Sequence, residues 1–203
     1  MWLRPGLGWT RRSLLASLPF LPFAARGAEK GRTFPVEGAR FADPATEFPV
    51  ERFSDLSYPS ILPYPYARAL ARKGAFFLCA SDRGDGMQAY RFELKKVEIR
   101  QLTAVAGLHP RTLTILPEDR AFAFVAGRSL YVAPLGSLRE REVYRIPDGW
   151  ELGEGFSVAL DGVYAVLVER HQQEGRSRLR LIGMTKGNAS TLMEQQGELR
   201  HRQ

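Results

Sequence analysis

The sequence predicts an all-β protein, and three observations support that prediction. Stretches that alternate apolar and polar residues, as half-buried strands do, recur from about residue 70 onward. Polar turns precede them at Gly74, Arg120 and Gly162, so the pattern repeats after 46 and then 42 residues. No segment has the periodicity of a helix longer than one or two turns. A repeat of 40 to 50 residues with three or four short strands per unit is typical of a β-propeller.

The first 28 residues predict an export signal. They hold four arginines and no acidic residue, and they include an apolar stretch of 12 residues, Leu14 to Ala25, followed by small residues suited to cleavage. A membrane-spanning helix needs about 20 apolar residues, so we expect no stable membrane span after cleavage. Arg11 and Arg12 resemble a twin-arginine signal, with an ordinary secretory signal and an uncleaved anchor as alternatives. The expected location is periplasmic or secreted.

The charge does not indicate a nucleic-acid-binding protein. The chain of 203 residues has a formal charge of +7, but without the four arginines of the signal 25 basic residues stand against 22 acidic ones, which leaves about +3. This mild excess suits an anionic ligand and excludes a strong basic footprint, so no nucleic-acid partner is expected. Cys79 is the one cysteine of the sequence, and its apolar surroundings predict a buried structural thiol.

Residues 29–69 form a proline-rich segment before the repeats. Proline removes a donor from a strand ladder, so this segment is not expected to lie within a central sheet throughout. The stretch EFPVERFSD, residues 47–55, is nevertheless predicted to supply an outer strand of the first repeat or of a closing unit.

Residues 70–203 contain three segments that share the order turn, strand, charged loop, strand. They predict blades at about residues 70–108, 109–150 and 151–195. A single β-sandwich, in which the hairpins resemble one another by chance, is the alternative.

These units resemble the repeats of periplasmic TolB-like propellers. The stretch CASDRGDGMQAYRFEL, followed by IRQLT, is close to the sequence pattern of those repeats. The order of features from residue 50 to 203 resembles more specifically the oligogalacturonate lyase family, whose members are seven-bladed propellers. The stretches that carry this resemblance are QLT, LYVAPLGSLREREVYRIPDGW and SRLRLIGMTKGNASTLME. The resemblance implies a partial propeller of about three to four blades, the N-terminal half of a seven-bladed ring.

The resemblance also implies a chemistry. The family cleaves galacturonate oligomers of pectin by β-elimination, in which a base removes the proton beside the uronate carboxylate and a divalent metal, typically manganese, neutralises that carboxylate. The family's catalytic histidine falls on His201, which makes His201 the candidate base. The family's metal ligands lie on later blades, so no metal site is expected in this chain, and the chain alone is expected to be inactive.

The sequence around three further residues predicts what each of them does. Arg83, in the stretch SDRGDG, is the candidate substrate-binding residue, because a guanidinium pairs well with a uronate carboxylate. A hairpin loop with capping aspartates is the alternative for that stretch. His109 is expected in a connection between blades and His171 at an exposed hairpin tip, and neither is proposed as a metal ligand.

A partial ring leaves apolar blade faces open. We therefore expect a truncated version of a longer protein, or one that needs another chain or the missing blades to close the ring. The expected ligand is an anionic oligosaccharide. The alternative functions are a TolB-like propeller that binds a protein or glycan without catalysis, and a remnant without a function of its own.

Overall fold

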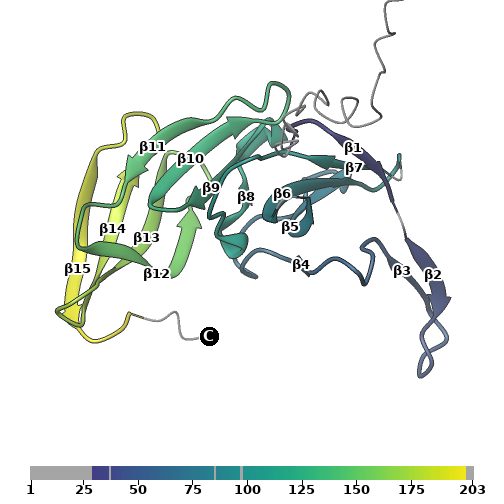
Figure 1. Cartoon of the computed structure of the whole chain (residues 1–203), viewed down its shortest axis with the longest axis horizontal. Helices are drawn as coiled ribbons and strands as arrows, with labels where there is room; N and C mark the ends of the chain where they lie inside the picture. The colour runs from purple at the N-terminus through teal and green to yellow at the C-terminus, as the bar shows by residue number, and fades with distance from the viewer. Residues whose placement is uncertain (1–28, 37, 85, 97, 200–203) are drawn as a thin grey trace, which may run out of the picture.

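The computed structural model describes residues 29–199, except 37, 85 and 97, and within them it contains strands, turns and two short 3-10 segments. The all-β prediction is confirmed. Three antiparallel sheets stand side by side along the long axis of the molecule, and a separate two-stranded hairpin projects at the end that holds the first sheet (Figure 1). We call these sheets the first, second and third blade. None of the described helices is long and apolar enough to cross a membrane.

Each blade is built mostly from consecutive strands. The first has the order β1–β7–β6–β5–β4, the second β11–β10–β9–β8 and the third β12–β13–β14–β15. The bounds in the first blade are β1 Thr33–Pro35, β4 Ser60–Ile61, β5 Phe76–Gly84, β6 Gly86–Glu93 and β7 Glu98–Gln101. Those in the second are β8 Thr114–Ile115, β9 Ala121–Ala126, β10 Ser129–Pro134 and β11 Arg141–Arg145, and those in the third are β12 Trp150–Val158, β13 Tyr164–His171, β14 Arg176–Gly183 and β15 Ala189–Gln196. The 3-10 segments are η1 Pro110–Thr112 and η2 Pro117–Asp119.

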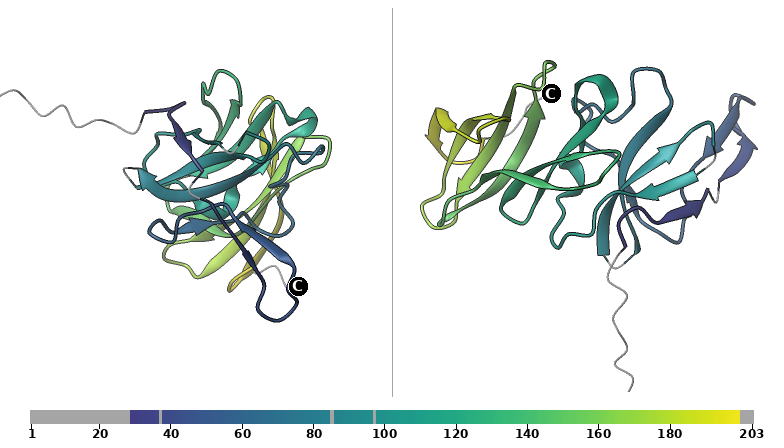
Figure 2. Two further views of the ribbon diagram at one scale, coloured as in Figure 1. Left: turned by 90° about the vertical axis from the view of Figure 1, so that its right-hand side faces the viewer. Right: turned by 90° about the horizontal axis from the view of Figure 1, so that it is seen from above.

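The blades are held together by apolar side chains on facing sheets. Strand β9 belongs to two core clusters at once, because its sequence AFAFVA is apolar at every position. Phe122 and Phe124 pack in the cluster shared with the first blade, while Ala123 and Val125 pack with Leu167 and other residues of the third. A strand buried on both faces needs such a continuous apolar run. The arc of three sheets is visible from above (Figure 2).

The outer strand of the first blade comes from an unexpected place. β1 pairs with β7, so Thr33–Pro35 forms the outermost strand of that sheet. The stretch around Pro49 does not join any blade: β3 (Pro49–Arg52) pairs instead with β2 (Ala39–Ala42) in the projecting hairpin. Proline lacks the amide proton that a blade ladder would use, so a two-stranded hairpin tolerates it better.

Candidate functional site

A cavity of about 370 Å³ lies between the third blade, η1 and the segment that follows β4. Its walls come from parts of the chain that are far apart in sequence: Tyr64, the turn His109–Thr112, the middle of β12, facing residues of β13 and β14, and the end of the described chain at Glu198 and Leu199. Cavities of a few hundred cubic ångströms with a few converging polar groups are the usual form of small-ligand sites. Several polar side chains line this one, and they are held differently.

Arg111 sits in a rigid turn. The Thr112 hydroxyl donates to the carbonyl of His109 at 2.8 Å and accepts from the backbone amide of Val125 at 2.9 Å, which ties η1 to β9. The backbone amide of Tyr64 donates to the carbonyl of Arg111 at 3.1 Å. The Arg111 side chain is exposed, and with the described residues it makes no ion pair. Its guanidinium lies 5.8 Å from the centre of the Tyr64 ring.

Tyr64 belongs to an aromatic pair. Its ring stacks on that of Tyr66 with centroids 5.1 Å apart and planes 9° from parallel. Tyr64 lines this cavity, and Tyr66 lines a second, more apolar cavity of about 360 Å³ beside it. Pro63 and Pro65 alternate with the two tyrosines, and proline restricts the backbone here. The proline-rich segment before the repeats therefore presents two stacked tyrosines on a stiff backbone.

Glu154 lines both cavities and is exposed. It lies in a bulge of β12, where the pairing with β13 shifts between Leu152 and Phe156. Glycines flank it: a Cβ on Gly153 would stand 2.7 Å from Val168 Cγ1, and Gly155 has φ 148°. Bulges that re-aim a side chain are common beside functional sites. Within the described part of the chain, Glu154 makes no ion pair.

Arg170 is the second arginine of the cavity wall, and it is already partnered. Its Nε donates to Glu151 at 2.9 Å, and its Nη1 lies 3.4 Å from Glu198. This pairing raises the pKa of Arg170, chiefly through the hydrogen bond with Glu151. Two carboxylates thus neutralise Arg170, so Arg111 is the cation of this wall that can pair with an added anion.

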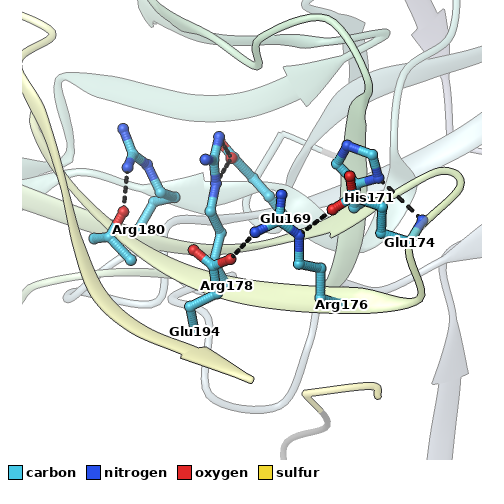
Figure 3. Close-up of polar contacts among 8 residues, drawn as sticks. Glu169, His171, Glu174, Arg176, Arg178, Arg180 and Glu194 are labelled. Carbon is cyan, nitrogen blue, oxygen red and sulfur yellow. Dashed lines mark hydrogen bonds and ion pairs between the residues drawn. The ribbon is translucent and has the colours of Figure 1, made fainter. Parts of the chain in front are cut away.

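Beside the cavity, a polar network of the third blade links side chains of β13, β14 and β15 (Figure 3), and its buried Glu169 also reaches the second blade. Glu169 is fully buried and accepts from Arg178 Nε at 2.7 Å and from the Tyr144 hydroxyl at 2.6 Å. Arg178 also lies over the Trp150 ring at 3.7 Å. Burial, and then the hydrogen bond to Glu169, raise the pKa of Tyr144 to about 12. Every charge in this network has a partner, which indicates a structural clamp rather than a ligand site.

Of the two site residues predicted from sequence, Arg83 does not line this cavity. His201 lies outside the described residues. Arg83 lies on β5, and its guanidinium packs over Tyr58 at 5.1 Å and Phe34 at 5.8 Å on the first blade. The expected loop around it is shorter than predicted, because β5 runs to Gly84 and β6 begins at Gly86.

The described histidines do not form a metal site. His109 is in a connection between blades and lines the cavity, with its Nε2 3.0 Å from the carbonyl oxygen of Gly127. His171 is the last residue of β13 and half-buried, not an exposed tip: its ring packs edge-on against Trp150, and its Nδ1 accepts from the Glu174 amide at 3.1 Å. Among the described residues, no three His, Cys, Asp or Glu side chains could hold a metal ion together, so manganese finds no ligand set there.

Sequence reasoning missed Tyr64, Arg111 and Glu154. The glycines around Glu154 were the available signal, since an isolated glycine within a strand pattern suggests a bulge. Arg111 and Tyr64 carried no such signal.

Comparison with solved structures places this fold. The oligogalacturonate lyase of Vibrio parahaemolyticus matches with a TM-score of 0.80 and 20% identity over 85% of this chain and 51% of the lyase. An oligogalacturonate lyase in complex with manganese matches with a TM-score of 0.77 and 22% identity over 82% of this chain and 49% of that chain. A putative TolB from Agrobacterium tumefaciens matches with a TM-score of 0.53 and 15% identity, over 74% and 54% of the two chains.

No protein-family model matches the sequence, and no curated protein matches it. The chain spans about half the length of the two lyase structures. The predicted structural resemblance and the predicted partial propeller are confirmed: this chain has the fold of about half of an oligogalacturonate lyase propeller.

Proposed function

We propose that this chain is the ligand-binding part of an exported propeller of the oligogalacturonate lyase type, which takes an anionic oligosaccharide built from galacturonate. One observation carries the proposal. The part of the fold that is similar to two oligogalacturonate lyases holds a cavity with an arginine that has no acidic partner among the described residues. The export signal predicted over residues 1–28 supports a role outside the cytoplasm.

The chemistry of the cavity suits a sugar acid. The planar fork of Arg111 matches a carboxylate in two-point geometry. The ring of Tyr64 in the cavity wall offers an apolar body on which a pyranose ring can rest. A neutral sugar would leave Arg111 without an anion, so the carboxylate is the group by which the site would distinguish a sugar acid from a neutral sugar.

Catalysis would need groups beyond this cavity. β-Elimination requires a base within reach of the proton next to the carboxylate and a positive group that stabilises the charge developing there. Arg111 can supply positive charge. His201 remains the candidate base through its resemblance to the family, and the lyase activity is part of the proposal.

A TolB-like propeller that binds without catalysis is the second candidate. It is supported by the match to the putative TolB.

The test is a calorimetric titration of the purified protein with trigalacturonate and with its fully methyl-esterified form, which keeps the hydroxyls and lacks the charges. We expect the free acid to bind, and Arg111→Ala to weaken its binding about 10-fold to 100-fold, as expected for a lost charge-assisted contact. The ester should bind weakly to both proteins. Arg40→Ala, on the remote β2–β3 hairpin, is the matched control and should leave binding unchanged.

Equal binding of acid and ester, or an Arg111→Ala variant that binds like wild type, would reject the proposed site. A lyase assay on the same samples, with and without manganese, tests the lyase candidate. Unsaturated product supports the lyase, and binding without product leaves a non-catalytic propeller or a lyase part that needs further groups for catalysis.

A further inference from the structure

The lining of the cavity carries two charged groups of opposite sign, and this polarity has a consequence for the ligand. Arg111 comes from η1, and Glu154 comes from the β12 bulge. Both lack an ion-pair partner among the described residues, and they do not pair with each other. A ligand in the cavity can therefore meet a positive group from one element and a negative group from the other.

An ionised carboxylate only accepts hydrogen bonds. Next to an anionic sugar it repels the sugar's own carboxylate and attracts the hydroxyl protons. When the sugar's carboxylate lies against Arg111 and its hydroxyls face Glu154, each of the two charged side chains has a complementary group. The reversed orientation would bring two carboxylates together and leave the guanidinium facing hydroxyls.

We propose that Glu154 is a specificity-determining residue that accepts hydrogen bonds from the hydroxyls of the bound sugar acid and so fixes its orientation in the cavity. This inference rests on the proposed function, because it takes the ligand's carboxylate to lie at Arg111. The ligand class is a polyhydroxylated acid, a uronate residue within an oligosaccharide, rather than a simple carboxylic acid.

The backbone supports this role. Gly153 lets β12 lie against Val168, because a Cβ there would come within 2.7 Å of the Val168 side chain. Gly155 adopts φ 148°, a conformation that other residues rarely adopt. An ordinary strand ladder needs neither feature, so the two glycines permit the bulge that carries Glu154 at the cavity. Bulged positions next to ligand sites commonly serve this purpose.

Arg170 and Glu198 complete the same wall without disturbing its polarity. Glu198 lies 3.4 Å from Arg170, and Glu151 accepts from Arg170 Nε at 2.9 Å. These charges are occupied with one another. Glu154 is left as the carboxylate of the wall that can accept from a ligand.

The experiment measures the affinity of wild type, Glu154→Gln and the control Glu51→Gln for trigalacturonate and for analogues that each lack one hydroxyl. Glutamine keeps the shape and removes the charge. Glu51 lies on β3, away from the cavity. We expect Glu154→Gln to weaken trigalacturonate binding about tenfold, the difference between a charged and a neutral hydrogen bond. Glu51→Gln should bind like wild type.

The analogues separate recognition from a purely structural effect. For at least one analogue, wild type should bind about tenfold more weakly than it binds trigalacturonate. Glu154→Gln should bind that analogue as well as it binds trigalacturonate, because the missing hydroxyl and the missing charge belong to the same contact. Independent losses, or a Glu154→Gln variant with wild-type affinity for trigalacturonate, would overturn the role of Glu154.

The two proposals fail in different ways. If trigalacturonate does not bind wild type, or if binding does not depend on Arg111, the proposed function fails and takes this inference with it. If binding depends on Arg111 and does not respond to Glu154→Gln, the proposed function stands and the inference alone is wrong.

Discussion

At the scale of single residues, three arginines near the cavity differ by what surrounds them. The Arg178 side chain is 15% exposed and lies between Glu169 and Trp150 of its own blade, and Glu169 in turn accepts from Tyr144 of the second blade. Arg170 is shared between two glutamates on the cavity wall. Arg111 lies 5.8 Å from the centre of an aromatic ring, and no described carboxylate pairs with it. The partner of each arginine thus decides its role: Arg178 is part of a clamp, Arg170 is neutralised on the wall, and Arg111 is the ligand contact that we propose.

The clamp gives a stability prediction. Glu169→Ala should lower the free energy of unfolding by about 3–5 kcal/mol, because it leaves the Arg178 guanidinium buried without its counter-charge. Urea denaturation measures the change. Glu142→Ala breaks an exposed pair with Arg145 and is the control that should stay close to wild type. Equal losses in the two variants would contradict the clamp.

The same network predicts a dependence on alkaline pH. The pKa of Tyr144 is raised from 10.0 to about 12, first by burial and then by its bond to Glu169. The folded state therefore holds the phenolic proton at a pH where the unfolded state has lost it. The stability from this group is fully present below pH 10 and is lost as the pH rises to about 12.

Tyrosinate absorbance and denaturation curves over that pH range check this prediction. Tyr144→Phe should remove the titration step near pH 12 and flatten the fall of stability. A wild type and a Tyr144→Phe variant with identical pH profiles would show that Tyr144 titrates as an ordinary tyrosine.

At the scale of elements, the β12 bulge is the feature that builds the site. It depends on space at Gly153, where a Cβ would meet Val168 at 2.7 Å. Gly153→Ala should destabilise the protein by about 1–3 kcal/mol through overpacking, and it should weaken trigalacturonate binding by displacing Glu154. Gly136→Ala, where no atom lies within 4 Å of the added methyl group, is the matched control.

A second variant tests the mechanism. Val168→Ala removes the methyl groups that the new Cβ would meet. In that background Gly153→Ala should cost clearly less than in wild type, since contacting residues are not additive. Full additivity would mean that the crowding at Val168 is not the cause.

The elements also explain what sequence could and could not predict. The strands around Phe76, Phe122 and Tyr164 either alternate apolar and polar residues or are continuously apolar, as buried strands are. The sequence pattern therefore predicted the blades. The outer strand at Thr33 was assigned to the stretch around Pro49, because strand pairing between distant segments leaves no local signal.

The site was harder to predict for the same reason. Tyr64, Arg111 and Glu154 are separated by 40 residues or more, and only the packing of blades brings them to one cavity. The prediction of Arg83 rested on the affinity of a guanidinium for a carboxylate, yet its neighbours in space are Phe34 and Tyr58. Residue type indicates what a side chain can bind, whereas the fold decides which side chains bind together.

At the scale of the whole molecule, the two outer blade faces differ. The far face of the first blade is covered by its own N-terminal segment, where Phe53 packs on Phe77, and Tyr90 and Phe92 beneath are almost fully buried. The far face of the third blade keeps Leu192 and Met193 exposed. The described arc therefore has a covered face at one end and a face with exposed apolar side chains at the other.

The cavity lies between the segment after β4, η1 and β12, the edge strand of the third blade. A ligand held by Arg111 and Glu154 would thus bridge the chain that precedes the second blade and the edge of the third.

The most direct test of this account is an amide-resolved NMR titration of the purified protein with trigalacturonate. We predict that the shifted resonances cluster on Tyr64, Arg111 and the bulge at Glu154, and that Arg111→Ala needs about 10-fold to 100-fold more ligand for the same shifts. Shifts that cluster instead on Arg83, Tyr58 and Phe34, or no shifts at millimolar ligand, would contradict it.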